Sequence, residues 1–223
     1  MNPGSFRKTS PLYPAELLNR RWLSRVAFEV RFTKPASFTF TPGQRIRFIY
    51  EEVDREYSLA CTPSDDTISL CIKLVEGGRF SSILSTAKKG DVFAFSGPHG
   101  YFVFMPSPRR AVFVATGTGI APFVSMSRSG VKGFVLLHGV PNAESLYYEE
   151  LFRSVQCEYI PCLSRGIESK DFFGGRVTDY LTKIMPRMQY DFYLCGRGDM
   201  VRDVTLLVDK KFSGSLVYTE TFY

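Results

Sequence analysis

The hydrophobic pattern of the chain changes at one short segment, Met105–Arg110, which contains two prolines. Before this segment, apolar and polar residues alternate in short runs such as Arg25–Phe32, with glycine and proline between the runs. Such runs predict an antiparallel β-barrel. After it, continuous apolar runs such as Ala111–Ala115 alternate with helical patterns, which predicts a doubly wound parallel sheet. The sequence therefore predicts an α/β protein of two domains, residues 1–104 and residues 105–223.

The individual elements follow from the same patterns. Further strands are expected over Arg45–Tyr50, Thr67–Val75, Asp91–Phe95, Gly133–His138, Glu158–Leu163, Asp191–Cys195 and Leu216–Tyr223. Helices are expected after the glycine-rich turn that begins at Gly117, and over Phe80–Ala87, Ser145–Ser154 and Met200–Lys210. With 223 residues, of which 44% are hydrophobic, the chain has enough apolar side chains for two cores.

Charge and cysteine usage narrow the class of protein. The formal net charge is +6, which favours an acidic partner: nucleic acid, anionic lipid or an acidic protein. The basic residues are scattered and no nucleic-acid motif is present, so no nucleic-acid partner is expected. No apolar run is long enough to cross a membrane, and Met1–Pro14 lacks the apolar centre of a secretory signal. Five cysteines without a zinc or iron–sulfur spacing predict a reduced, cytoplasmic protein without a metal, which we expect to be a monomer.

One glycine-rich motif predicts a nucleotide site. Gly117-Thr118-Gly119-Ile120-Ala121-Pro122 follows an apolar strand and opens a helix. Glycines let a pyrophosphate approach the backbone, and the first amides of a helix attract an anion. An ordinary strand–helix turn would give the same six residues, so this motif alone favours a nucleotide only slightly.

Four other features each have two interpretations. Arg55-x-Tyr57-Ser58 offers a phosphate-binding guanidinium and two hydroxyls, or else a solvated edge strand. Gly77–Ser82 is either a second phosphate-binding helix start or a plain helix cap. The arginines of Ser164-Arg165 and Gly175-Arg176 either bind a phosphate monoester or are solvated at the surface. Cys195 is either a site residue or a small buried side chain.

The order of these motifs resembles that of the ferredoxin–NADP(+) reductase superfamily of flavoproteins. The resemblance extends over nearly the whole chain and rests on seven stretches: Phe40–Gln44, Arg55–Ser58, Gly78–Ser81, Gly97–Gly100, Gly117–Pro122, Cys195–Met200 and Glu220–Phe222. It implies a flavin-binding antiparallel barrel followed by an α/β domain that binds a nicotinamide nucleotide. Taken together, the ordered set outweighs the simple interpretation of each motif.

The resemblance also implies a role for individual residues. FAD would be bound by Arg55, Glu56, Tyr57, Ser58, Gly78, Arg79, Phe80, Ser81, Phe222 and Tyr223. NADP would be bound by Thr116, Gly117, Thr118, Gly119, Pro122, Ser164, Arg165, Arg176, Cys195, Gly196 and Met200. Ser58, Cys195 and Glu220 would surround the reacting atoms, and either Phe222 or Tyr223 would stack on the flavin.

The implied function is hydride transfer between NADP(H) and FAD, and single-electron transfer to or from a small acidic carrier. Gly139-Val140-Pro141 stands where the family often has Gly-Val-Arg, which removes one nucleotide contact. No iron–sulfur module is recognised in the chain, so the expected carrier is a separate ferredoxin or flavodoxin. Two alternatives are an NADH-dependent reductase component of an oxygenase, and a regulatory subunit that keeps the flavin fold without turnover.

Overall fold

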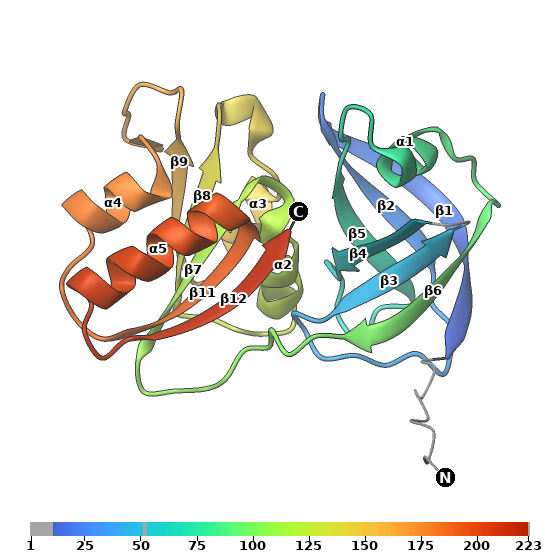
Figure 1. The fold of residues 1–223 in the computed structure, drawn as a ribbon, viewed down its shortest axis with the longest axis horizontal. Coiled ribbons are helices and arrows are strands. Elements are labelled where there is room, and N and C mark those ends of the chain that lie inside the picture. Colours follow the sequence, from blue (N-terminus) through green and yellow to red (C-terminus); the bar gives the residue numbers. More distant parts are fainter. Residues whose placement is uncertain (1–10, 51–52, 223) are drawn as a thin grey trace, which may run out of the picture.

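A computed structural model describes residues 11–50 and 53–222, which form two lobes, each built around a six-stranded sheet (Figure 1). The first lobe contains β1 (Leu12–Ser24), β2 (Ala27–Thr33), β3 (Arg45–Tyr50), β4 (Val53–Ser58), β5 (Thr67–Lys73), α1 (Arg79–Thr86) and β6 (Val92–His99). The second contains β7 (Arg110–Thr116), η1 (Gly117–Ile120), α2 (Ala121–Arg128), β8 (Val135–Val140), η2 (Ala143–Ser145), α3 (Glu149–Ser154), β9 (Glu158–Leu163), β10 (Phe173–Gly174), α4 (Val177–Lys183), β11 (Tyr190–Arg197), α5 (Gly198–Lys211) and β12 (Leu216–Phe222).

The first lobe is the predicted antiparallel barrel. Its strand order is β4-β3-β6-β1-β2-β5, and each neighbouring pair is antiparallel. A bridge between Leu59 and Leu70 joins the two ends of this order and closes the sheet. Aromatic side chains fill the interior, among them the fully buried Phe48 and Phe95. A closed sheet leaves no long unpaired edge, which is why these short alternating strands are stable together.

The second lobe is the predicted doubly wound sheet. All pairs in the order β10-β9-β8-β7-β11-β12 are parallel. Successive residues of β7 face opposite sides: Phe113 packs in the same cluster as α2 and α3 residues, while Val112 and Val114 pack with α4 and α5 residues. Helices therefore cover both faces of the sheet, which explains the continuous apolar runs of its strands.

The two lobes share an apolar interface on the α2–α3 side of the parallel sheet. Buried barrel residues such as Ala60 and Phe102 belong to the same cluster as the α2 side chains. Hydrogen bonds also cross the interface, among them those from Ser125 Oγ to the Cys61 carbonyl at 2.6 Å, from Arg128 Nη1 to the Ala60 carbonyl at 2.9 Å, and from the Tyr148 hydroxyl to Glu29 Oε2 at 2.9 Å. The division at residues 104 and 105 stays a prediction, because Phe104 itself packs on the second lobe.

Four elements differ from the sequence-based expectation, and the shortest, the two-residue strand β10, is too short for a period-two pattern. β1 was not expected, because only Ala15 and Leu17 of its thirteen residues are fully buried and its register shifts twice. α4 was missed because it is short and buries only two side chains, too few for a helical period. The helix expected over Ser145–Ser154 is replaced by η2 and a shorter α3, separated by a segment that includes Tyr148, whose φ is +57°.

Candidate functional site

The glycine-rich turn lies at the carboxyl end of β7, in the middle of the parallel sheet. Gly117 has a φ of +53°, which suits glycine, and η1 then leads into α2, with Pro122 in its first turn. A side chain at Gly119 has no space, because a Cβ there would lie 2.7 Å from the carbonyl carbon of Cys195. The turn after β7 and the turn after β11 are therefore in direct contact.

A buried histidine on the neighbouring strand β8 contacts the backbone of this turn. His138 on β8 is fully buried, with Nε2 3.2 Å from the Gly117 carbonyl oxygen and Nδ1 3.3 Å from the Tyr159 hydroxyl. Burial lowers the pKa of His138 to about 4, whereas the Gly117 carbonyl opposes the shift. The imidazole is therefore neutral at pH 7 and fixes the turn by hydrogen bonding.

Two of the predicted reacting residues lie side by side at the same sheet edge. Cys195 on β11 is the register partner of Glu220 on β12, and of Ala115 on β7 on its other side. Cys195 is fully buried, and burial, followed by the nearby Glu220 charge, raises the pKa of its thiol well above the usual value. The thiol is therefore protonated. Met200, in the first turn of α5, is also buried.

The Arg55–Ser58 stretch presents two different faces to its surroundings. Tyr57 packs its ring on Phe80 of α1, and burial raises the pKa of its hydroxyl to about 12. Ser58 lies on the other face, opposite Arg45 of β3. Ser58 is buried, and its Oγ has no hydrogen-bond partner among the described residues. Because buried hydroxyls are nearly always paired, this orphaned oxygen is a candidate ligand contact.

The turn before α1 is tightly built. A Cβ at Gly78 would lie 2.8 Å from Ser81 Oγ and 2.9 Å from Val75 Cβ, so glycine is needed there. The Val75 amide donates to Ser81 Oγ at 3.2 Å, which leaves the Ser81 hydroxyl proton free to donate elsewhere. Phe80 is buried in the barrel core, so its side chain supports the site rather than lining it.

A groove of about 630 Å³ separates the barrel from the carboxyl ends of the parallel strands. It is lined by Gln44, Arg45, Arg47, Glu56, Pro98, His99, Gly100, Tyr101, Phe102, Tyr218, Thr219 and Glu220. In the groove Arg45 Nη1 lies 2.9 Å from the Glu220 carboxylate, so one ion pair joins the two lobes. Burial and, more weakly, Glu56 raise the pKa of Glu220, while Arg45 opposes both. No motif in the sequence indicates a role for Arg45, because its partner Glu220 is 175 residues away.

The two arginines expected at a phosphate monoester lie at the β9 side of the sheet. Ser164, Arg165 and Arg176 are exposed. The Leu163 carbonyl accepts hydrogen bonds from the amides of Gly166 and Gly175, at 3.1 and 3.0 Å. This shared acceptor brings the segments that carry Arg165 and Arg176 together. Phe222 is partly buried against the second lobe, and Tyr223 lies outside the described residues, as do Met1–Ser10 of the expected signal-free N-terminus.

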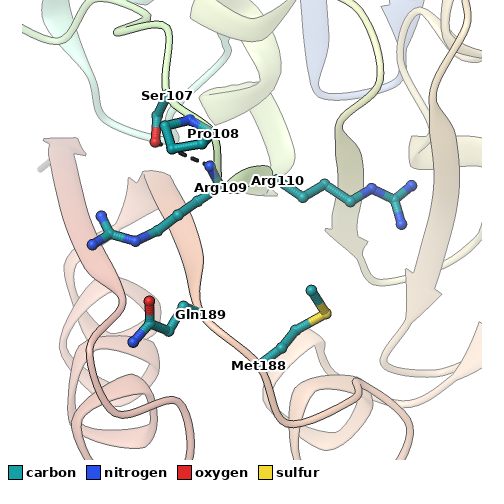
Figure 2. Close-up of a pocket in the computed structure, with 6 residues that line it drawn as sticks. All are labelled: Ser107, Pro108, Arg109, Arg110, Met188 and Gln189. Atoms are coloured by element: carbon teal, nitrogen blue, oxygen red, sulfur yellow. Dashed lines mark hydrogen bonds between the residues drawn. The ribbon is translucent and has the colours of Figure 1, made fainter.

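A second hollow, of about 660 Å³, lies at the amino ends of β7 and β11 (Figure 2). Figure 2 shows the side chains of Arg109 and Arg110 pointing away from each other across it. Both are ion-paired, Arg109 with Asp191 and Arg110 with Glu158. Because Arg110 is the first residue of β7 and the glycine-rich turn follows the last, the hollow lies at the other end of this strand from the turn.

The described part of the chain has neither a cluster of metal ligands nor a helix that could span a membrane. Across residues 11–50 and 53–222, no three His, Cys, Asp or Glu side chains are grouped as a metal site requires. Within the same residues, no helix is both long enough and apolar enough to span a bilayer.

A barrel followed by a doubly wound sheet, with glycine-rich turns where the lobes meet, defines a two-domain nucleotide-binding oxidoreductase. Residues 15–104 match the family described as oxidoreductase FAD-binding domain, and residues 113–205 match the oxidoreductase NAD-binding domain. The chain is 31% identical to ferredoxin–NADP reductase B of Sorangium cellulosum, over 69% of this chain and 70% of that protein. The chain belongs to the ferredoxin–NADP(+) reductase superfamily of flavoprotein oxidoreductases, as the motif order predicted.

Further matches include a component of an oxygenase system and a second ferredoxin NADP+ reductase. The chain is 30% identical to the toluate 1,2-dioxygenase electron transfer component of Pseudomonas putida, over 86% of this chain and 62% of that protein. A ferredoxin NADP+ reductase of Neisseria gonorrhoeae, solved with bound FAD and NADP, has the same fold, with a TM-score of 0.84, 20% identity, and coverage of 95% of this chain and 99% of that one. The chain spans 62% and 66% of the lengths of two Pseudomonas putida oxygenase components that it matches.

Proposed function

We propose that the protein is an FAD-dependent NADPH reductase that exchanges electrons with a separate ferredoxin or flavodoxin. One observation supports the proposal above all others: Ser58 from the barrel and Cys195 and Glu220 from the second lobe lie in elements that meet at the groove, and Arg45 connects them. The family-level match supplies the two cofactor classes, FAD and a nicotinamide nucleotide.

The residues present fit a flavin. The Ser58 hydroxyl, which has no partner among the described residues, offers a hydrogen bond, and the neighbouring Tyr57 offers a flat ring. The Gly78–Ser81 helix start and Arg55 offer amides and a guanidinium for the pyrophosphate. FAD, when bound, accepts a hydride from a reduced nicotinamide and releases electrons singly. The role of the protein is to place the two rings and exclude water.

The second lobe fits a nicotinamide nucleotide. The contact between Gly119 and Cys195 leaves only backbone at the middle of the sheet edge, where a pyrophosphate would approach. Exposed Ser164, Arg165 and Arg176 would bind a 2′-phosphate, which supports NADPH over NADH. The names of the oxygenase relatives support an NADH-dependent oxygenase reductase as the second candidate, with Pro141 in place of an arginine as its sequence feature.

Steady-state kinetics with a dye acceptor, run with NADPH and NADH side by side, test the proposal. We expect a yellow protein that releases FAD rather than FMN, with a higher kcat/KM for NADPH. The net charge of +6 also predicts that the rate with an acidic ferredoxin falls as salt rises. A colourless protein, or one that releases only FMN, would contradict the flavin assignment. Preference for NADH would favour the oxygenase role.

A further inference from the structure

We propose that Arg45 is a positioning residue of the reductase site: it lies opposite Ser58 in the barrel, reaches Glu220 of the second lobe, and fixes the Glu220 carboxylate at the boundary between the lobes. This inference rests on the proposed function. Arg45 lies between two carboxylates: its Nε is 2.5 Å from Glu56 Oε2, and its Nη1 is 2.9 Å from Glu220. Its side chain is 23% exposed and that of Glu220 is 13% exposed, so water screens the pair only partly.

The strand registers make Arg45 the link among the predicted reacting residues. Arg45 is directly opposite Ser58 in the β3–β4 pair, and Glu220 is directly opposite Cys195 in the β11–β12 pair. In an antiparallel pair such as β3–β4, directly opposite residues have Cβ atoms about 4.5–5.5 Å apart. The Arg45–Glu220 ion pair therefore closes a continuous row, Cys195–Glu220–Arg45–Ser58, that crosses the lobe boundary.

The neighbouring loop is shaped to hold the guanidinium. Gly100 has a φ of +87°, and a Cβ at this position would collide with the Arg45 guanidinium. The Gly100 carbonyl accepts a hydrogen bond from Gln44 Nε2 at 3.1 Å, which fixes the loop beside Arg45. The β3–β6 register also shifts between Arg45 and Arg47, so the pairing of the two strands is irregular beside Arg45. Arg45 is therefore held in place before any ligand binds.

The charges around Glu220 give the inference a pH signature. Burial and Glu56 of β4 raise the pKa of the Glu220 carboxyl, whereas Arg45 of β3 lowers it. Cys195 of β11 is protonated. The pKa of His99 on β6 is lowered by burial and by the charges of Arg47 and Arg45, so His99 is neutral at pH 7. Removing Arg45 takes away the cation that faces Glu220 and must raise the pKa of this carboxyl further.

Arg47 provides a matched control on the same strand. Its Nη2 lies 2.6 Å from Glu56 Oε1, so it shares one carboxylate partner with Arg45. No hydrogen bond or ion pair joins Arg47 to Glu220 in the described part of the chain. Arg47→Gln therefore removes the same charge and a bond to the same Glu56, but leaves the bridge between the lobes in place.

The test uses the FAD-loaded protein and four variants: Arg45→Gln, Arg45→Lys, Arg47→Gln and Glu220→Gln, with the Arg45→Gln/Glu220→Gln double variant. Anaerobic stopped-flow measures the pH profile of flavin reduction by NADPH, and thermal unfolding at each pH gives a readout independent of turnover. We expect Arg45→Gln to move the midpoint of the profile upward by about one unit or more, as for an opposite charge in contact. Arg45→Lys keeps a positive charge and should move the midpoint less than Arg45→Gln does. Arg47→Gln should also move the midpoint less than Arg45→Gln does.

The double variant decides the mechanism. In the Glu220→Gln background, Arg45→Gln should no longer move the pH profile, and the Tm losses of the two single variants should not add. Equal shifts for Arg45→Gln and Arg47→Gln, or additive losses in the double variant, would overturn the inference. If NADPH does not reduce the wild-type flavin, the proposed function fails, while the Tm cycle still reports whether the ion pair couples the lobes.

Discussion

Gly119 of the turn after β7 packs directly against the backbone of Cys195 at the end of β11. A Cβ added at Gly119 would lie 2.7 Å from the Cys195 carbonyl carbon and 2.7 Å from the Gly196 Cα. Both contacts are with backbone, which cannot move aside as a flexible side chain does. The two glycine-containing motifs, 76 positions apart, are thus parts of one surface.

Gly119→Ala should therefore disturb the surface much more than Gly117→Ala. A Cβ at Gly117 meets nothing within 4 Å, so Gly117→Ala costs only its φ of +53°, about 1–2 kcal/mol. Gly119→Ala must displace β11, and overpacking of this kind costs about 1–3 kcal/mol and also moves Cys195. Thermal unfolding and titration with NADP(+) measure both effects. Equal nucleotide affinity in the two variants would show that the Gly119 contact is irrelevant to binding.

A second prediction compares two buried serines. Among the described residues, Ser58 Oγ and Ser127 Oγ are both buried without a hydrogen-bond partner. Replacing either by alanine removes an unpaired polar atom, so neither variant should lose stability. Only Ser58 lies opposite Arg45, a residue of the groove, so only Ser58→Ala should slow flavin reduction, by about tenfold for one lost hydrogen bond. Stopped-flow and melting curves on both variants provide the comparison. Normal reduction in Ser58→Ala would return Ser58 to a packing role.

The sequence was sufficient for the architecture because local patterns determine it. Period-two alternation and continuous apolar runs distinguish the two sheets, and the glycine motifs locate the sheet edge. β1 could not be predicted from the alternation of apolar and polar residues, because polar residues in its middle make tertiary contacts. Arg20, for example, donates hydrogen bonds to the carbonyls of Leu84 and Ala87, both at 3.1 Å. Only the folded chain shows why that strand is long and poorly alternating.

The site could be predicted only in part, because sequence motifs report residue types but not partners. The glycine turns follow from backbone requirements that leave a local signature. Arg45 has no such signature, since its role depends on Glu220, 175 residues away on another sheet. His138 is similar: its contact with the Gly117 carbonyl arises from the pairing of β8 with β7. Arg45 and His138, which support the predicted site, therefore could not be identified from the sequence motifs.

A third prediction concerns acid stability. Burial lowers the pKa of His138 to about 4, so between about pH 6.5 and 4 the unfolded chain binds a proton at this residue and the folded protein does not. Stability must then fall as pH falls through this window, by about 3 kcal/mol from His138 alone. His138→Gln keeps a polar side chain without this titration. Denaturant unfolding at pH 7 and pH 4.5 should show a smaller acid loss in the variant, and parallel losses would contradict the assignment.

A fourth prediction concerns nucleotide choice. Arg165→Ala and Arg176→Ala should each raise KM for NADPH and leave KM for NADH nearly unchanged. Losing one charge-assisted hydrogen bond costs about 1.5–3 kcal/mol, or roughly tenfold or more in affinity. Arg202→Ala is the control, because Arg202 is exposed on α5 and pairs with its neighbour Asp203. Steady-state kinetics with both nucleotides decide the matter. Equal losses with NADPH and NADH would show that these arginines serve the fold.

The last prediction concerns the C-terminal aromatic residues. Phe222 ends β12 opposite Arg197 of β11, with its side chain partly buried against the second lobe. We expect Phe222 or Tyr223 to cover the flavin face that the nicotinamide must occupy, which lowers nucleotide affinity by the fraction of protein in which the ring is displaced. Deleting Phe222 and Tyr223 should then tighten NADP(+) binding, weaken discrimination against NADH and change the flavin spectrum.

Single variants separate this role from packing. Phe222→Ser and Tyr223→Ser show which ring covers the flavin, since only that one should change the spectrum. Val217→Ala is the control on the same strand, because Val217 packs in the cluster that contains the α4 and α5 side chains. This change should lower Tm and leave the spectrum and the NADP(+) affinity unchanged. If the truncated protein instead loses about 3–5 kcal/mol of stability, as for a core aromatic residue, while its spectrum and affinity stay constant, the C-terminal rings are structural.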